Sequence, residues 1–346
     1  MTTVNVLVTG GAGFIGSNFV RWAHDRHPDW RITTLDKLTY AGRLENLREV
    51  MDSPRHRFVK GDVADAAVSA PLVRESNIVV HFAAETHVDR SIQSAGDFIR
   101  TDVLGTFVLL EAAREASALD RFVQISTDEV YGSVPHGHSR ETDELRPRNP
   151  YSASKAGADR LAYSYFATYG VPVIVTRASN NYGSHQFPEK VIPLFITNAI
   201  DNLPLPLYGD GLNVRDWLYV ADHCSAIRTV IARGRPGEVY NVGGWNEKTN
   251  REIVHTVCGL LDEMRPDPAG PYERLITHVK DRPGHDRRYA IDARKIERQL
   301  GWRPAETFDS VIRKTVRWVL DHADWVAAVQ SGGYRDWVAA NYGARG

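Results

Sequence analysis

The sequence has little cysteine, no long apolar run and no surplus of one charge, and each absence excludes a class of protein. Only two cysteines, Cys224 and Cys258, occur in 346 residues, which is too few for a disulfide framework and shows no spacing typical of a metal site. We therefore expect two buried free thiols, no bound metal and a reducing cytoplasm as the compartment.

No apolar run approaches the ~18 residues that a membrane-spanning helix needs. The N-terminus enters an apolar strand pattern at Val4, without the basic region and long apolar core of a signal peptide. The 42 basic and 43 acidic residues balance, so we expect no general binding to nucleic acids or membranes. With 42% hydrophobic residues, the chain can bury a full core as one large domain or two closely joined ones.

Short apolar runs alternate with amphipathic stretches in the first half of the chain, a pattern typical of βαβ units in a parallel sheet. The runs are rich in β-branched residues and nearly continuous, which indicates strands covered by helices on both faces. The predicted strands are 4–9, 31–36, 57–60, 78–83, 122–126 and 171–177. These features predict an α/β fold with a Rossmann-type doubly wound parallel sheet.

The pattern becomes less regular after Arg177, where proline and glycine are frequent. We therefore expect a Rossmann domain at residues 1–178, to which some later segments return, and a smaller C-terminal lobe at residues 179–346. The sequence shows no internal repeats or low-complexity tracts.

A glycine-rich turn, GGAGFIG at residues 10–16, follows the first predicted strand and opens an amphipathic helix. The backbone N–H groups and the helix dipole at such a turn can meet a pyrophosphate. Glycine is needed where the backbone turns tightly or approaches the phosphates closely, because a Cβ atom would obstruct either. The context favours a dinucleotide site over the alternative, an ordinary glycine-rich turn.

Asp36 lies 20 residues beyond Gly16, at the end of the next predicted strand. A carboxylate there can bind both hydroxyls of the adenine ribose and would repel a 2′-phosphate, so it favours NAD over NADP. Lys37 and Arg43 are nearby positive charges that weaken this preference. Asp62, after the third strand, is either an adenine ligand or a solvated turn residue.

Tyr151 and Lys155 share one face if their segment is helical, because they are four residues apart. The ammonium can then lower the pKa of the phenol from its ordinary value of about 10, and the positive charge of nicotinamide would act in the same direction. Such a phenolate can take the proton of a substrate hydroxyl while hydride leaves the same carbon. The spacing alone is common by chance, but it becomes informative after a Rossmann-type half.

Thr127, Asp128 and Glu129 follow an apolar strand directly, at the carboxyl edge where doubly wound sheets bind ligands. Two adjacent carboxyl groups in a dry cleft cannot both stay ionised cheaply, so one tends to hold a proton and the pair offers an acid beside a base. The alternative is a solvated cap or loop pair. Strand alternation would also point the two side chains apart, so they converge only if the strand has already ended.

The three segments together join a redox site to an acid/base pair. A plain dehydrogenase has no use for the second carboxyl group. The combination therefore indicates an enzyme that oxidises its substrate, eliminates a group from it and reduces it again.

The chain resembles the extended short-chain dehydrogenase/reductases, and among them those that dehydrate a nucleotide-bound glucose. The resemblance covers nearly the whole sequence and includes Tyr151 with Lys155. The other matching segments are TGGAGFIGSN (9–18), DKLTYAG (36–42), AAETHVDRS (83–91), STDEVYG (126–132), NNYG (180–183), PEK (188–190), LYGDG (207–211), RDW (215–217) and DRPGHD (281–286). Thr86 stands where many relatives carry serine and Ser184 where proline is usual, and neither difference threatens the chemistry.

The resemblance implies conversion of dTDP-glucose to its 4-keto-6-deoxy derivative. Tyr151 would deprotonate the 4-hydroxyl as hydride passes from C4 to NAD+, with Lys155 tuning the phenol and Thr127 hydrogen-bonding the same oxygen. Glu129 would then remove the C5 proton while protonated Asp128 serves the departing 6-hydroxyl, and hydride would return to C6.

The resemblance also implies the binding residues and the assembly. The NAD-binding residues would be Gly10, Gly13, Phe14, Ile15, Gly16, Asp36, Lys37, Thr39, Gly42, Asp62, Val63, Ala83, Tyr151, Lys155 and Asn180. The sugar-nucleotide site, placed in the second lobe and its border, would use Thr86, His87, Asp89, Thr127, Asn181, Lys190, Tyr208, Arg215, Asn250, Arg282 and His285. Long helices at 97–116 and 151–169 would pair with a twofold mate, which predicts a homodimer.

Three other functions use part of the same residues. A sugar-nucleotide 4-epimerase would keep the glycine turn, Tyr151 and Lys155 but has no need for Asp128 beside Glu129. A decarboxylase of sugar nucleotides needs no acid for a 6-hydroxyl. A non-catalytic NAD-binding protein would be expected to have lost at least one of these four residues, and all four are present.

Overall fold

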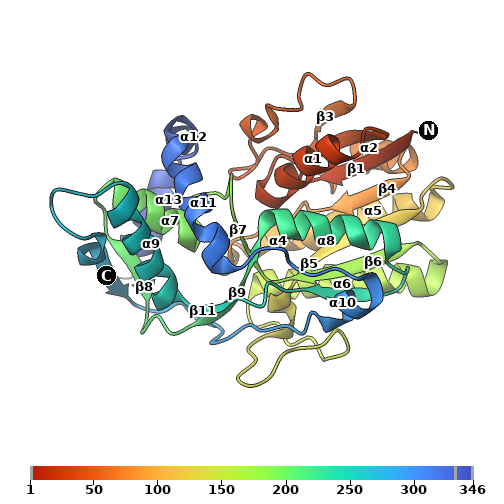
Figure 1. The fold of residues 1–346 in the computed structure, drawn as a ribbon. Helices are drawn as coiled ribbons and strands as arrows, with labels where there is room; N and C mark the ends of the chain where they lie inside the picture. The colour runs from red at the N-terminus through yellow and green to blue at the C-terminus, as the bar shows by residue number, and fades with distance from the viewer. Residues whose placement is uncertain (1–2, 331–332, 344–346) are drawn as a thin grey trace.

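The central element of the fold is a seven-stranded parallel sheet, seen in a computed structural model that describes residues 3–330 and 333–343 (Figure 1). The strands lie in the order β3-β2-β1-β4-β5-β6-β10 and all pair in parallel. Their bounds are β1 (Val4–Thr9), β2 (Trp30–Asp36), β3 (His56–Lys60), β4 (Ile78–His81), β5 (Arg121–Thr127), β6 (Val173–Ala178) and β10 (Val239–Val242). All six predicted strands are confirmed, with ends that differ by at most two residues.

Helices cover both faces of this sheet, which is why its strands are apolar on both sides. One face carries α1 (Phe14–Arg26), α8 (Val220–Arg233) and α10 (Arg294–Leu300). The other face carries α2 (Ala66–Arg74), α5 (Gly105–Glu115) and α6 (Pro150–Tyr169). The predicted doubly wound α/β fold is therefore confirmed. The direction of strand order reverses between β1 and β4, which is where such sheets bind ligands.

The smaller lobe holds a second core between two short sheets and three helices (Figure 1). Its strands are β7 (Asn180–Tyr182), β8 (Leu205–Tyr208), β9 (Val214–Tyr219), β11 (Glu247–Thr249) and β12 (Ile276–Val279). Its helices are α7 (Val191–Ile200), α9 (Asn250–Met264) and α11 (Phe308–Asp321), followed by α12 (Ala323–Val329) and α13 (Gly333–Gly343). Strand β10 and helices α8 and α10 come after residue 178 and lie with the large sheet. The domain boundary at residue 178 itself stays a prediction.

Two helical stretches near the sheet correspond to the two predicted long helices, and the first carries Tyr151 and Lys155. Helix α6 begins at Pro150 because Asn149 caps it, with the Asn149 side chain accepting from the Ser152 N–H at 2.9 Å, and it ends at Gly170 in the left-handed conformation. The predicted helix at 97–116 is helical but not uniform. It consists of α4 (Ala95–Phe98), a π-helical turn (Ile99–Leu104) and α5, preceded by α3 (Val88–Gln93).

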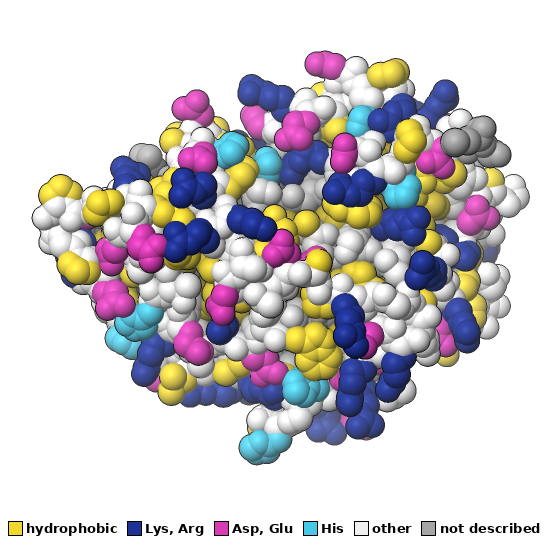
Figure 2. Space-filling model, in the orientation of Figure 1, with side chains coloured by type: hydrophobic (Ala, Val, Ile, Leu, Met, Phe, Trp, Pro, Cys, Tyr) yellow, Lys and Arg dark blue, Asp and Glu magenta, His cyan; other side chains and the backbone are white. Residues whose placement is uncertain are grey.

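Both cysteines are free and buried, as expected from their number and spacing. Within residues 3–330 and 333–343, none of the helices combines the length and apolarity that crossing a bilayer requires. On the face drawn in Figure 2, basic, acidic and hydrophobic side chains are intermixed.

Candidate active site

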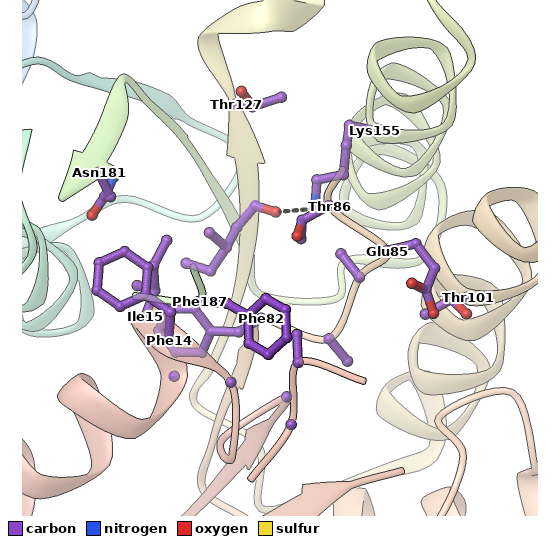
Figure 3. Close-up of a pocket in the computed structure, with 18 of the residues that line it drawn as sticks. Phe14, Ile15, Phe82, Glu85, Thr86, Thr101, Thr127, Lys155, Asn181 and Phe187 are labelled. Carbon is purple, nitrogen blue, oxygen red and sulfur yellow. Dashed lines mark hydrogen bonds between the residues drawn. The ribbon is translucent and has the colours of Figure 1, made fainter. Parts of the chain in front are cut away.

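A single pocket runs along the carboxyl ends of the central strands and continues to the smaller lobe (Figure 3). It is lined by all the residues predicted to bind NAD, by all five predicted catalytic residues, and by Thr86, Asn181 and Lys190 of the predicted substrate site. The fold thus brings together segments that lie as far apart in sequence as Gly10 and Lys190.

The glycine turn forms the first wall of the pocket, at the N-terminus of α1. Gly10 has φ of +69°, and a Cβ atom there would lie 2.6 Å from the Ala83 nitrogen. A Cβ atom on Gly16 would overlap the carbonyl oxygen of Gly10. The missing side chains allow the tight turn that brings the N-terminus of α1 to the pocket, where it can meet the pyrophosphate of a dinucleotide.

Asp36 lies at the end of β2 and is buried. Burial raises the pKa of its carboxyl group, and hydrogen bonds from the N–H groups of Leu38 (2.8 Å) and Ala12 (2.9 Å) partly offset that effect. Lys37 pairs with Asp62, with its Nζ 3.0 Å from Asp62 Oδ2. The Lys37 charge, one of the two that could have accepted a 2′-phosphate, is therefore already paired, and with the buried Asp36 carboxylate this fits NAD better than NADP.

The floor of the pocket also has polar atoms suited to a ligand. Ser126 Oγ and Asn180 Oδ1 are buried and have no hydrogen-bond partner among the described residues. Buried polar atoms are nearly always paired in proteins, so these two fit a pocket that binds a polar molecule.

Strand β5 ends at Thr127, and a 3₁₀ turn (Asp128–Tyr131) begins at once. Thr127 caps this turn, with its Oγ1 accepting from the Glu129 N–H at 3.2 Å. Because the strand has ended, the side chains of Asp128 and Glu129 need not point to opposite faces, and both line the pocket. The interpretation of the pair as a solvated loop is wrong, since Asp128 is only 2% exposed.

Asp128 has the features of a protonated acid. Burial raises the pKa of its carboxyl group well above the ordinary value, and the negative charges of Glu129 and Asp216 raise it further. Its Oδ1 accepts a hydrogen bond from Thr127 Oγ1 at 3.2 Å, whereas its buried Oδ2 has no partner among the described residues. An acidic oxygen is thus available inside the pocket.

Glu129 is held by Tyr289, which the sequence analysis missed. Its Oε2 lies 3.2 Å from the hydroxyl of Tyr289, which also lies 2.8 Å from Asp286 Oδ2. The guanidinium of Arg215 stacks over the Tyr289 ring, 4.1 Å from its centroid. No local motif marks Tyr289, because its contact with Glu129 spans 160 residues.

Tyr151 and Lys155 lie one turn apart on α6 and are both buried. The expected lowering of the Tyr151 pKa is wrong for the protein alone. Burial raises this pKa well above 10, the charges of Glu129 and Asp102 raise it further, and a hydrogen bond with Thr127 lowers it. The sequence shows that Lys155 is near Tyr151, but it does not show that burial would raise the pKa of the phenol. Lys155 Nζ donates to the Ile125 carbonyl oxygen at 2.7 Å, and burial lowers its own pKa.

Further lining residues were not predicted, among them Phe82, Glu85, Thr101 and Phe187, which Figure 3 labels. Glu85 and Thr101 lie together at one end of the view, away from Asn181. Burial first, and the charges of Asp102 and Asp97 next, raise the pKa of Glu85 to about 7. Glu85 lies inside the matching segment 83–91 and could have been found there, whereas no sequence signal marks Thr101.

Thr86, Thr127, Asn181 and Lys190 of the predicted substrate residues line this pocket, and several of the others cluster around Asp89. Lys190 Nζ donates to the Thr86 carbonyl oxygen at 2.8 Å. The Tyr208 hydroxyl donates to Asp89 Oδ2 at 3.2 Å, and Arg282 Nη1 lies 4.0 Å from the same oxygen.

The other predicted substrate residues lie around that cluster. His285 packs edge-on against Tyr208, with ring centroids 5.9 Å apart. Arg215 donates to the Asp286 carbonyl oxygen at 2.9 Å. His87 is buried at the start of α3, and Asn181 Oδ1 pairs with His223 Nδ1 at 2.9 Å. Asn250 begins α9, and its backbone N–H donates to Asn213.

The Rossmann sheet, the glycine turn and the Tyr151–Lys155 pair together define an oxidoreductase-type nucleotide site of the short-chain dehydrogenase/reductase class. The buried Asp128 beside Glu129 adds acid/base chemistry to that class.

Comparison with known proteins narrows the class. The family described as GDP-mannose 4,6 dehydratase matches residues 7–315. A dTDP-glucose 4,6-dehydratase from Shigella flexneri is 51% identical over 362 residues, which cover 99% of this chain and 100% of the relative. One from Neisseria meningitidis serogroup B is 53% identical over 345 residues, 95% of this chain and 97% of the relative. The crystal structure of a dTDP-glucose 4,6-dehydratase from Streptomyces venezuelae, with NAD and TYD bound, matches with a TM-score of 0.89 and 48% identity, covering 94% of this chain and 99% of that one. The chain belongs to the dTDP-glucose 4,6-dehydratase family.

Proposed function

We propose that this protein dehydrates dTDP-glucose to dTDP-4-keto-6-deoxyglucose with NAD as a bound cofactor. One observation supports this function above all: a buried Asp128, whose pKa burial and the charge of Glu129 raise, lies beside Glu129 in the same pocket as Tyr151 and Lys155. Oxidation alone uses the last two residues, and elimination of water uses the first two.

The oxidation step depends on Tyr151. As a phenolate, Tyr151 would accept the proton of the substrate 4-hydroxyl, and Thr127, which hydrogen-bonds the Tyr151 oxygen, would bond the same substrate group. When bound, NAD would serve as hydride acceptor for C4 and, once reduced, as hydride donor to C6, and the positive charge of its oxidised form would favour the phenolate. Lys155 holds a positive charge behind the phenol.

The elimination step depends on the two carboxyl groups. The 4-ketone acidifies the C5 hydrogen, and Glu129, held by Tyr289, takes that proton. Asp128 gives its proton to the departing 6-hydroxyl, which leaves as water. A proton then returns to C5 as C6 is reduced.

The diphosphate of the substrate lies toward the smaller lobe in this proposal. Arg215, Lys190 and Arg282 are cations there, and fixed positive donors suit phosphate oxygens. Asn181, Tyr208, Asn250 and His285 complete the nucleotide side, and Thr86, His87 and Asp89 lie along the sugar.

Asp128 argues against the other functions. A 4-epimerase returns hydride to C4 and expels nothing, so a buried acid beside the base would have no task there. The same holds for a decarboxylase, which loses carbon dioxide and not a hydroxyl. A non-catalytic role would leave no reason for the buried Asp128 carboxyl group beside Glu129, since burying such a group destabilises the fold.

The assembly and compartment are part of the proposal. Hydrophobic side chains lie exposed along the π-helical turn, α5 and α6, with Ile99 at 53%, Phe107 at 41% and Tyr163 at 42%. A second copy of the chain on these helices would cover them and form a homodimer. The two free buried thiols fit the reducing cytoplasm.

The test is to incubate the purified protein with a panel of sugar nucleotides and to follow loss of one water by mass spectrometry. We expect dTDP-glucose to react with little or no added NAD, and NAD to copurify. The alkali absorbance of the 4-keto product confirms the position of oxidation. Net release of one NADH per product would contradict the internal redox cycle.

Variants separate the two steps. Replacing Asp128 with Asn removes the acid but leaves Tyr151 and Lys155 in place, so elimination should slow by about 10²–10⁴-fold while NADH accumulates on the protein. Replacing Glu129 with Gln should block elimination and also suppress exchange of the C5 hydrogen with deuterium from solvent. Replacing Tyr151 with Phe should stop the reaction before NADH forms. Normal dehydration in either carboxyl variant would refute these roles.

A further inference from the structure

Arg90, on α3, is surrounded by residues from three other segments. Its guanidinium lies between two aromatic rings, 3.9 Å from the centroid of Tyr40 and 4.6 Å from that of Trp337. Its Nε donates to Glu189 Oε2 at 3.0 Å, and the Tyr40 hydroxyl donates to Glu189 Oε1 at 2.9 Å. We call these four residues the Arg90 latch.

The latch joins both ligand sides of the pocket. Tyr40 lies between Thr39 and Ala41, which line the cofactor part. Glu189 lines the pocket too, and Lys190 next to it holds Thr86 by its carbonyl oxygen. A shift of Arg90 would therefore move the walls on both sides.

Through Trp337 the latch also holds the C-terminal helix α13 over the predicted substrate residues. The Trp337 ring packs edge-on against His87, with centroids 4.8 Å apart. Further along α13, Asn341 Nδ2 donates to the Tyr208 hydroxyl at 3.4 Å, and Tyr342 stacks on the Tyr208 ring at 6.0 Å. Helix α13 thus supports His87 and Tyr208 from outside.

Arg90 stabilises the other three residues of the latch, because it compensates the charge of Glu189 and contacts both aromatic rings. The Glu189 side chain is 1% exposed and that of Arg90 is 24% exposed, so both groups are largely removed from water. A buried carboxylate that loses its cation is strongly destabilised, and a cation over aromatic rings is bound more tightly when desolvated. The Arg90 guanidinium contacts both Tyr40 and Trp337, and Phe187 and Tyr334 also connect Tyr40 with α13.

We propose that Arg90 is a positioning residue for the reaction, which holds the cofactor loop, the Glu189–Lys190 segment and α13 in the arrangement that binds the sugar nucleotide. The inference rests on the proposed function. Arg90 acts on substrate affinity and NAD retention, and it leaves the chemistry of Tyr151, Asp128 and Glu129 unchanged.

The first experiment compares Arg90→Met and Arg90→Lys with wild type in the full chain. We expect Arg90→Met to raise the KM for dTDP-glucose about tenfold, to lower kcat less than about threefold, and to reduce the fraction of NAD that copurifies. Arg90→Lys keeps the positive charge and should restore part of the substrate affinity and part of the NAD retention. The matched control is Arg26→Met, because Arg26 also lies over a ring, 4.9 Å from the centroid of Trp22, but is 53% exposed and does not line the pocket.

A double-mutant cycle of Tyr40→Leu and Trp337→Leu tests whether the latch acts as one unit. Their effects on KM should be less than additive, since either change disrupts the same arrangement around Arg90. Unchanged KM and NAD retention in Arg90→Met, or fully additive effects in the cycle, would overturn the inference even if the variants were less heat-stable. If wild type does not dehydrate dTDP-glucose, the proposed function fails first, and NAD retention in the same variants still decides the role of Arg90.

Discussion

The ion pair between Asp159 and Arg177 allows a quantitative test of how α6, which carries Tyr151 and Lys155, is attached to the sheet. Arg177 Nε donates to Asp159 Oδ2 at 2.8 Å and its Nη2 donates to Oδ1 at 3.0 Å, with exposures of only 1% and 0%. Arg177 Nη1 also donates to the Tyr131 hydroxyl at 2.7 Å. We consider the replacement Asp159→Asn, which keeps the shape but removes the charge.

The magnitude follows from burial. Removing one partner of a buried pair leaves the other charge uncompensated and usually destabilises a protein by about 3–5 kcal/mol. The amide introduced by this replacement would keep one acceptor for Arg177, so we expect a loss near the lower end, about 3 kcal/mol. Burial alone would raise the pKa of Asp159, but the hydrogen bonds and charge of Arg177 lower it overall. The stabilisation is therefore present above the unfolded-state pKa of about 3.9 and is lost as pH falls through the folded-state value.

The assay is urea unfolding followed by tryptophan fluorescence, near pH 7, at one NAD concentration. The matched control is Arg160→Gln, since Arg160 also pairs with Asp159 but its side chain is 48% exposed. An exposed partner should contribute about 0–1 kcal/mol. A loss under about 1 kcal/mol in Asp159→Asn near pH 7, or an equal loss in the control, would refute the reasoning.

Two further predictions concern Glu85 and the helices of the proposed dimer. Burial raises the pKa of the Glu85 carboxyl group to about 7. Its ionisation therefore destabilises the folded state increasingly above the unfolded-state pKa of about 4.3, and fully above pH 7. We expect Glu85→Gln to raise the free energy of unfolding by about 1–3 kcal/mol near pH 8 and to change it little near pH 4. An equal effect at both pH values in urea titrations would contradict this. For the dimer, light scattering at micromolar concentration should give twice the chain mass for the wild type. Phe107→Glu places a charge among the exposed hydrophobic side chains of the proposed interface and should give the monomer mass. A wild-type monomer would show that these side chains stay exposed.

Local patterns in the sequence determined the parts of the structure that depend on near neighbours. The apolar runs predicted six strands because a strand covered on both faces must be apolar throughout. The glycine turn and Asp36 predicted the cofactor wall because a missing Cβ atom and a strand-end carboxylate act within one βαβ unit. The Thr127–Asp128–Glu129 segment indicated an acid beside a base, although the sequence left open whether the strand had ended before them.

Only the tertiary structure decided the properties that depend on distant segments and on burial. The end of β5 at Thr127 brings both carboxyl groups to one pocket. Desolvation raises the pKa of Asp128, and it also raises that of Tyr151, which the sequence analysis had expected to be lowered. Tyr289 reaches Glu129 across 160 residues, and Trp337 reaches Arg90 from the far end of the chain. No periodicity records such contacts, because they exist only once the two lobes have packed and excluded water from the groups between them.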